Sequence, residues 1–426
     1  MVASKLCKRD MTIGLMIASL EIGGAQRAIL SLAAGLRREG FSVRLILLED
    51  KRIMPLPGDA QMQAYLSKNT YVLSKKNWWR DRLSTLGKMI GLTVCIWKLK
   101  RMLREEKLSV MVSFLERANI LNLIAVREIP RVISIRKHME MALAEKTWLK
   151  AILIRIGYSL LLHRATVVVC NSRESAMSFE KLFPVKDTQV HAILNCASDD
   201  IFPGSMADDT VKGIGESGAQ IVAMGRFKPA KGFVPLIRSF RLVANQFPSA
   251  ELVIIGDGPD RRKLERMIRA LKLDGRVRLP GFLGNPVSVL KQSLIFVCSS
   301  RSEGFPNALV EAMMLGLPVV AADCHSGPRE ILEPSTDPRR KATKLETASF
   351  GIIVPKMPLS DLGADFELQA SEIALADGMI KLLNDDALRI SYGALAKRRA
   401  LEFAPDKMVS EWESLLVNIT TVKHSP

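Results

Sequence analysis

The sequence predicts an α/β protein made of two Rossmann-like domains, and three observations support this class. Short apolar runs alternate with longer amphipathic segments, as in parallel sheets covered by helices. The run at residues 11–20 leads into a Gly-Gly turn, and a similar strand with a Gly-containing turn begins again at residue 221. The length of 426 residues provides enough chain for two substantial cores.

The first domain is predicted over residues 1–196. Strands are expected at five apolar runs, which are residues 11–20, 41–48, 108–114, 131–135 and 165–170. Gly23 and Gly24 form the turn from the first strand into a helix, but the G-x-G-x-x-G pattern of nicotinamide- and flavin-binding domains is absent. The sequence therefore indicates no such cofactor.

A linker rich in Gly, Ser and Asp is predicted over residues 197–218, before a second domain over residues 219–404. The expected strands of this domain begin at residues 221, 253, 276, 294, 318 and 352, and its last two helices cover residues 368–384 and 386–403. Pro405 separates them from a helix at residues 406–419, which lies in a C-terminal segment of residues 405–426.

The most informative stretch is residues 297–332. A strand ends at residue 298, a Ser-rich turn leads through Gly304 and Phe305 into a helix near Pro306 and Asn307, and a second strand covers residues 318–322. Ligands of such βαβ units bind at the carboxyl ends of the strands. The free N–H groups of the first helical turn, together with the helix dipole, favour a phosphate there.

Charged residues of both signs surround this predicted site. Glu303 and Glu311 are separated by seven residues, so both carboxylates can face one cleft and accept hydrogen bonds from a sugar diol. Alternatively, Glu303 only stabilises the helix dipole and Glu311 is a solvated surface charge. Arg226 follows a strand, and Lys231 comes five residues later, which makes a cationic cradle for an anion.

These motifs resemble those of the retaining glycosyltransferases of family four, which have the GT-B fold. The shared pattern is a strand, then S-x-x-E-G-F-P-N, a helix and G-x-P-V-V, with the two glutamates in E-x7-E spacing. The continuation through Ser326-Gly327-Pro328 is similar to a bacterial branch that builds surface polysaccharides. The resemblance implies two Rossmann-like domains facing across a cleft, with the C-terminal helix crossing back to the first domain.

The resemblance also implies roles for individual residues. Arg226 and Lys231 would hold the donor diphosphate, Glu303 the transferred sugar and Glu311 the ribose, with residues 304–307 completing the donor site. Phe282 would lie near the nucleotide base, or in the core. In the first domain, the Gly23-Gly24 loop would lie near the donor phosphate or the acceptor, or be only a tight turn. Either Arg136 or His138 would line the sugar site, although a histidine among charged residues is commonly solvated.

The chemistry expected of this site uses no metal and no cofactor. The chain contains no Asp-x-Asp motif, so fixed cations and the helix N-terminus would stabilise the departing nucleoside diphosphate. The donor is a nucleotide-sugar, with UDP favoured over GDP, and the acceptor a lipid-linked oligosaccharide of polysaccharide or lipopolysaccharide biosynthesis. Two alternatives remain: an epimerase or phosphorylase with the same fold, and a basic nucleic-acid-binding protein. Against the nucleic-acid-binding alternative, the basic segments of this chain lack zinc-binding and helix-turn-helix signatures.

The net charge of +17 is concentrated in the first domain. Residues 75–107 contain ten Lys or Arg against three Asp or Glu, and residues 127–164 contain eight against three. Tryptophans accompany these charges at positions 78, 79, 97 and 148, and apolar residues follow Trp148 along one side of a predicted helix. Each segment alone fits an ordinary amphipathic helix. Together they favour docking on an anionic membrane surface, with no nucleic-acid partner.

The remaining composition indicates a cytoplasmic protein attached peripherally to the inner face of the plasma membrane. The six cysteines are far apart in sequence, and several lie in apolar runs, so they are expected to be reduced core thiols. No segment has the roughly 18 uninterrupted apolar residues of a spanning helix. The apolar run at residues 11–20 is too short for a spanning helix and lacks the cleavage site of a signal peptide.

Overall fold

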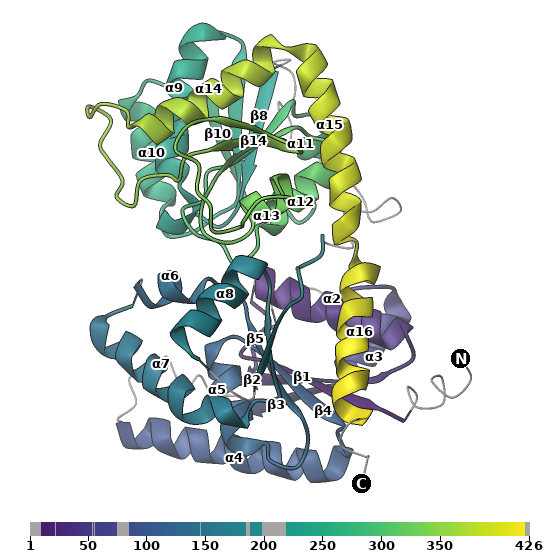
Figure 1. Cartoon of the computed structure of the whole chain (residues 1–426). Coiled ribbons are helices and arrows are strands. Elements are labelled where there is room, and N and C mark those ends of the chain that lie inside the picture. The colour runs from purple at the N-terminus through teal and green to yellow at the C-terminus, as the bar shows by residue number, and fades with distance from the viewer. Residues whose placement is uncertain are drawn as a thin grey trace. The chain divides into compact units, whose positions relative to one another are not determined.

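The computed structural model describes residues 10–421 except 22, 53, 55, 75–84, 145, 185–187 and 198–218, and only the backbone of residues 85–90. Two compact units are present (Figure 1). The first comprises the chain up to Asn171, Ser175–Cys196 and the chain from Pro405 onward, and the second comprises Ser172–Glu174 and Ala197–Ala404. The predicted linker lies outside the described residues from position 198 onward.

The first unit is built on a seven-stranded parallel sheet with the order β3-β2-β1-β4-β5-β6-β7. The strands are β1 (Thr12–Ile17), β2 (Ser42–Glu49), β3 (Thr70–Ser74), β4 (Val110–Phe114), β5 (Arg131–Ile135), β6 (Val167–Cys170) and β7 (Gln189–Ala192). The sequence predicts five of them. It misses β3 and β7, which are edge strands with partly exposed residues and therefore lack a continuous apolar run.

Helices cover both faces of the first sheet. They are α2 (Gly24–Arg38), α3 (Ala60–Lys68), α4 (Thr85–Glu106), α5 (Glu116–Ala125), α6 (Met139–Ala144), α7 (Trp148–Leu161), η1 (Leu162–Arg164), α8 (Arg173–Leu182) and α16 (Pro405–Thr421). Side chains alternate along each strand, so Ile13 and Leu15 of β1 pack with α2 and α16, whereas Met16 packs with α4 and α5 on the opposite face.

The C-terminal helix α16 belongs to the first unit, as the resemblance implies. Trp412 is almost fully buried and stacks on Phe114 at the end of β4, with ring centroids 6.1 Å apart. Helix α16 also lies close against α2, because a Cβ atom on Gly35 would lie 2.2 Å from Cγ2 of Val409. The last helix therefore completes the core of the first unit.

The second unit contains another seven-stranded sheet with the order β10-β9-β8-β11-β12-β14-β13, parallel except for β13. The strands are β8 (Ala219–Met224), β9 (Ala250–Ile255), β10 (Val277–Gly281), β11 (Ile295–Cys298), β12 (Val319–Ala322), β13 (Glu346–Ala348) and β14 (Gly351–Val354). Only β13 is absent from the sequence prediction. This strand has three residues, which is too short for a recognisable pattern.

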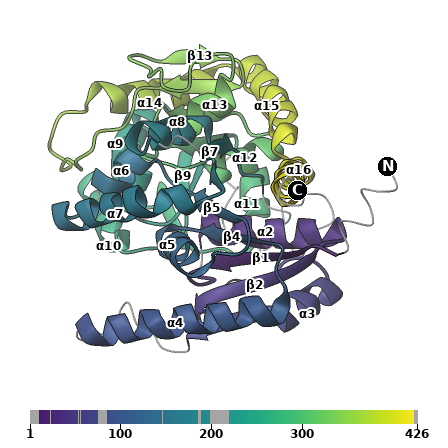
Figure 2. The same cartoon turned by 60° about the horizontal axis from the view of Figure 1, so that its bottom comes forward.

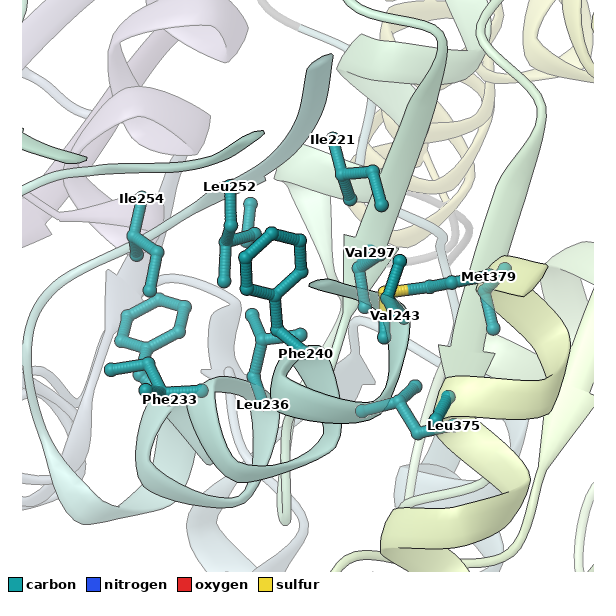
Figure 3. Close-up of a cluster of buried hydrophobic side chains, with 14 of the residues drawn as sticks. Ile221, Phe233, Leu236, Phe240, Val243, Leu252, Ile254, Val297, Leu375 and Met379 are labelled. Atoms are coloured by element: carbon teal, nitrogen blue, oxygen red, sulfur yellow. The ribbon is translucent and has the colours of Figure 1, made fainter. Parts of the chain in front are cut away.

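The helices of the second unit also lie on both sides of its sheet. They are η3 (Pro229–Lys231), α9 (Phe233–Gln246), α10 (Arg261–Ala270), α11 (Val287–Lys291), α12 (Asn307–Met314), α13 (Pro328–Leu332), α14 (Ala370–Asn384), α15 (Asp386–Ala400) and η4 (Leu401–Phe403). Phe233, Leu236 and Phe240 of α9 pack with Leu252 and other strand residues in one core (Figure 3). The α/β class with two parallel-rich sheets is therefore confirmed.

Two further expectations concern cysteines and membrane spans. Cys95, Cys170, Cys196, Cys298 and Cys324 are free and buried, as predicted, whereas Cys7 lies outside the described residues. Among the helices that the structure describes, none combines the length and the apolar composition that crossing a membrane requires.

Candidate functional site

The candidate site lies at the carboxyl ends of β8 and β11, which are neighbours in the second sheet. Arg226 follows β8 by two positions, Lys231 ends the short helix η3, and Glu303 lies between β11 and α12. Because parallel strands end at the same edge of a sheet, these segments meet although about 70 residues separate them in the sequence.

The structure brings Lys231 and Glu303 into direct contact. The Lys231 ammonium donates to Oε1 of Glu303 at 2.6 Å, and the hydroxyl of Ser300 donates to the same oxygen at 2.6 Å. Burial lowers the pKa of Lys231, but the Glu303 carboxylate raises it more, so the pKa lies above its ordinary value. Lys231 is therefore charged at neutral pH, and both side chains are held in place before any ligand binds.

A glycine allows η3 to approach β11 closely. Gly232 ends η3 in the left-handed region, at φ 63°, and a Cβ atom there would lie 2.1 Å from the carbonyl oxygen of Ser299. The Ser299 hydroxyl donates to the carbonyl of Lys231 at 3.0 Å. The turn that carries Lys231 is thus attached to the strand end that leads to Glu303.

Helix α12 begins at Asn307, one residue later than the sequence predicts, and Pro306 precedes it. Pro306, the N-cap residue, provides no side-chain acceptor for the first turn of the helix. Gly327 packs against Pro306, because a Cβ atom on Gly327 would lie 2.2 Å from Cδ of Pro306. Gly304 and Phe305 are buried beside this turn.

Other predicted donor-site residues differ in exposure. Glu311, in the second turn of α12, is 1% exposed, so the alternative that it is a solvated surface charge is wrong. Phe282 is 51% exposed, so a place in the core is wrong for this residue, which follows the end of β10. Arg226 is exposed and makes no hydrogen bond or ion pair with the residues that the structure describes.

Arg136 and His138, in the first unit, are both buried. The Arg136 guanidinium lies 5.0 Å from the centroid of the Phe114 ring and donates to Oδ1 of Asn195. Burial lowers the pKa of Arg136 to about 10, so the side chain stays charged at neutral pH. His138 follows β5 and is only 4% exposed, so the expectation that it is solvated is wrong.

The Gly-Gly loop of the first unit forms the expected connection. Gly23 precedes α2 in extended conformation, and the helix begins at Gly24 with no acidic residue in its first turn. Gly23, the N-cap residue, provides no side-chain cap for this helix. The structure therefore confirms the turn from β1 into a helix, while a phosphate or an acceptor at this loop stays a prediction.

Comparison with known families identifies the fold and the chemistry class. A model described as "Glycosyltransferase Family 4" matches residues 22–200, and one described as "Glycosyl transferases group 1" matches residues 207–337. The chain is a glycosyltransferase with a family 4 domain followed by a group 1 domain. The two matches lie one after the other in the chain, so together they include the residues of the candidate site in the second unit.

Individual relatives of this glycosyltransferase agree with the assignment. An uncharacterized glycosyltransferase of Methanocaldococcus jannaschii is 29% identical, over 75% of this chain and 82% of the relative. The N-acetylgalactosamine-N,N'-diacetylbacillosaminyl-diphospho-undecaprenol 4-alpha-N-acetylgalactosaminyltransferase of Campylobacter jejuni is 24% identical, over 94% of this chain and 97% of the relative. The enzyme is therefore a hexosyltransferase related to bacterial proteins of surface polysaccharide synthesis.

Solved structures show the same architecture. The crystal structure of HepE from Anabaena, in complex with UDP and glucose, superposes with a TM-score of 0.69 and 17% identity. The match covers 96% of this chain and all of the HepE chain. The glycosyltransferase thus has the GT-B fold that the sequence motifs imply.

The sequence analysis missed the residues that hold the turn carrying Lys231 in place. The backbone N–H of Arg301 donates to the carbonyl of Ala230 at 2.8 Å, and Nη1 donates to the carbonyl of Pro229 at 3.0 Å. The same guanidinium pairs with Asp361, which also accepts from Lys263 at 2.5 Å. Arg301 lies inside the S-x-x-E motif, but nothing in the sequence connects it with Asp361, 60 positions later.

Proposed function

We propose that this glycosyltransferase is a retaining, metal-independent enzyme that moves a hexose or N-acetylhexosamine from a nucleotide-sugar to a lipid-linked oligosaccharide. The contact between Lys231 and Glu303 carries the proposal. It places an ammonium and a carboxylate 2.6 Å apart at the carboxyl ends of adjacent strands. An anionic diphosphate and a hydroxyl-bearing sugar need these two groups side by side.

The departing diphosphate would be stabilised by fixed charges. Lys231 and the exposed Arg226 would contact its oxygens, and Glu303 orients the ammonium of Lys231. The first N–H groups of α12 would also face the diphosphate, with the positive end of the helix dipole behind them. Lys231 and the start of α12 are in place before reaction, so these groups need little reorganisation as charge develops. Glu303 would at the same time accept hydrogen bonds from the transferred sugar, and Glu311 from the ribose.

Retention of the anomeric configuration would follow from attack on the face that the phosphate leaves. The bond from the anomeric carbon to the phosphate oxygen breaks, and the acceptor oxygen bonds to the same face of the carbon. The departing phosphate takes the acceptor proton, so no side-chain base is assigned. UDP-sugars are expected ahead of GDP-sugars, which agrees with the UDP bound in HepE.

The acceptor is proposed to be a lipid-linked oligosaccharide at the inner face of the plasma membrane, in surface polysaccharide or lipopolysaccharide synthesis. The name of the Campylobacter relative describes transfer to a diphospho-undecaprenol acceptor. Such an acceptor is anchored in a bilayer, so the enzyme would work at an anionic membrane surface. The excess of positive charge in the first unit supports this location.

The proposal is tested with Glu303→Gln and Arg226→Met. Each is expected to lower turnover by about 10²–10³, by analogy with the loss of one oxyanion-stabilising group. Glu251→Gln and Arg269→Met are matched controls, because Glu251 lies at the start of β9 and Arg269 near the end of α10, away from the carboxyl ends of the strands, and their variants should keep full activity. Radioactive transfer from UDP-sugars to a lipid-linked acceptor measures the rate. Undiminished transfer by both site variants would reject the assignment.

Two further measurements examine the stereochemistry and the metal independence. The product formed from an α-linked donor should be α-linked, as read from the anomeric proton coupling in NMR spectra. Transfer should continue at an unchanged rate after dialysis against a chelator. A β-linked product contradicts retention, and loss of activity that added divalent ions restore contradicts metal independence.

A further inference from the structure

Helix α7 of the first unit, which is labelled in Figures 1 and 2, exposes many large apolar side chains. Six of its large apolar side chains are between 42% and 74% exposed. They are Trp148, Leu149, Ile152, Leu153, Ile156 and Leu160, called here the α7 stripe. Exposed apolar side chains normally occur singly on a protein surface, so six on one helix of 14 residues indicate a binding surface.

The stripe is not needed to hold α7 on the first unit. A different side of the helix, with Ala151, Ile154 and Tyr158, packs into the core beside β5 and β6. Tyr158 is fully buried and contacts Phe179 with ring centroids 6.0 Å apart. Helix α7 therefore has one apolar side that serves the fold and a second apolar side that faces solvent.

The exposed side has a defined width and charged borders. Successive helical residues are about 100° apart, so the stripe covers an arc of about 140° from Trp148 to Leu153. The same spacing puts Arg155 beside the Trp148 edge and Lys150 beside the Leu153 edge, and both are exposed. Helix α7 contains no acidic residue. An apolar stripe between two cations is typical of helices that lie on anionic membranes.

In the other basic, tryptophan-bearing segment, the side chains that the structure describes, those of residues 91–107, do not have this arrangement. In the described part of α4, Cys95, Leu99 and Met102 are buried against the first sheet, and only Trp97 is an exposed large apolar residue. From residue 91 onward, α4 is thus the ordinary amphipathic helix that the sequence analysis considered. Trp78 and Trp79 lie outside the described residues. The structure therefore distinguishes two segments that look alike in sequence.

We propose that α7 is the membrane-docking element of this glycosyltransferase and lies in the plane of an anionic lipid bilayer. The α7 stripe would enter the acyl region, while Lys150 and Arg155 reach the lipid phosphates from its two borders. A helix of 14 residues is about 21 Å long, shorter than the roughly 30 Å hydrocarbon core, which favours an in-plane position. This proposal names the element that would bring the enzyme to the membrane. It depends on the proposed function only for the chemical nature of the acceptor.

Docking through α7 would also place the first unit's candidate residues near the lipid. Trp148 follows His138 by ten positions, and only the short helix α6 and its turn intervene. The carboxyl end of β5, with Arg136 and His138, would then lie close to the membrane surface. An acceptor whose lipid tail stays in the bilayer could present its head group there without leaving the membrane.

The test uses the full-length chain without substrates. Co-sedimentation with vesicles of phosphatidylglycerol and phosphatidylcholine should exceed that with phosphatidylcholine alone. The double variant Leu153→Asp/Leu160→Asp should bind the anionic vesicles at least about tenfold more weakly, because both side chains would have to enter the acyl region. Lys150→Glu/Arg155→Glu should abolish the preference for anionic vesicles. Ile390→Asp is the matched control, since Ile390 is 72% exposed on α15 of the second unit, and should bind as the wild type does.

Three outcomes would overturn the inference. The wild type fails to sediment with anionic vesicles, the stripe variant binds as tightly as the wild type, or analytical ultracentrifugation shows a dimer that the stripe variant dissociates. The last result would make the α7 stripe a subunit interface. Circular dichroism and sugar transfer to a water-soluble acceptor analogue should be unchanged in the stripe variant, which separates docking from folding and catalysis. Absent transfer by the wild type would instead reject the proposed function and leave the vesicle result standing.

Discussion

At the scale of single residues, Arg301 links the candidate site to the body of the second unit. Its guanidinium is 4% exposed and contacts both the turn that carries Lys231 and the carboxylate of Asp361. The ammonium of Lys231, in turn, donates a hydrogen bond to Glu303. The position of the ammonium therefore depends on a buried arginine that is not expected to touch the donor.

The variant Arg301→Met should lower both stability and donor binding. Removing one partner of a buried ion pair costs about 3 kcal/mol of unfolding free energy, and the carbonyl of Pro229 would lose its donor. We expect a lower melting temperature and a smaller rise in that temperature when UDP is added. Differential scanning fluorimetry measures both.

The matched control for this position is Lys263→Met. Lys263 donates to the same Asp361 but is more exposed, and among the described residues it makes no hydrogen bond with the turn at Pro229. This variant should keep the UDP-dependent rise of the wild type. An equal loss of that rise in both variants would show that the Asp361 segment, and not the Arg301 contact with the turn, supports donor binding.

At the scale of elements, the short helix η3 is held close against the end of β11. Gly232 ends it in a left-handed conformation, with the carbonyl oxygen of Ser299 where a side chain would begin. Any other residue would separate η3 from the end of β11. Lys231 would then move away from Glu303, although both residues remained in the chain.

The variant Gly232→Ala is expected to destabilise the protein by about 2–4 kcal/mol, from left-handed strain and from the clash with Ser299. Gly275→Ala is the matched control, because Gly275 also has a positive φ, of 75°, but no atom lies within 4 Å of its Cβ position. It should cost only about 1 kcal/mol. Urea unfolding measures the free energy of unfolding of both variants. Similar losses would show that the close approach of η3 to β11 does not contribute to stability.

At the scale of the whole molecule, the chain builds the first unit from its two ends. Helix α16 begins directly after the second unit ends at Ala404, yet it packs on α2 and on the end of β4. Trp412 is the largest buried side chain of this contact. The stability of the first unit therefore depends on residues that are synthesised after the second unit.

The variant Trp412→Ala should destabilise the first unit selectively. Truncating a fully buried tryptophan costs about 3–5 kcal/mol. Hydrogen exchange followed by mass spectrometry should become faster in β1, β4 and α2 and stay unchanged in β8 and α9. Trp97→Ala is the control, because Trp97 is 59% exposed and should have little effect. Equal acceleration of exchange in both units would mean that they unfold as one cooperative body.

The sequence by itself determined the α/β class, all but three of the fourteen strands that the structure describes, and the segments that form the donor site. These features are local. A strand buried on both faces needs a continuous apolar run, and the turn from β11 to α12 needs its characteristic residues within a few positions. The edge strands β3 and β7 and the three-residue β13 were missed because partial exposure or short length removes that signal.

Only the tertiary structure decided which distant residues touch and which side chains face solvent. The ion pair of Lys231 with Glu303 joins positions 72 residues apart, and that of Arg301 with Asp361 joins positions 60 residues apart. The burial of Glu311 and His138, and the exposure of the α7 stripe, likewise depend on neighbours from other elements. A helical pattern states that apolar residues share a side of a helix, but the packing of the whole unit decides whether that side is covered by protein.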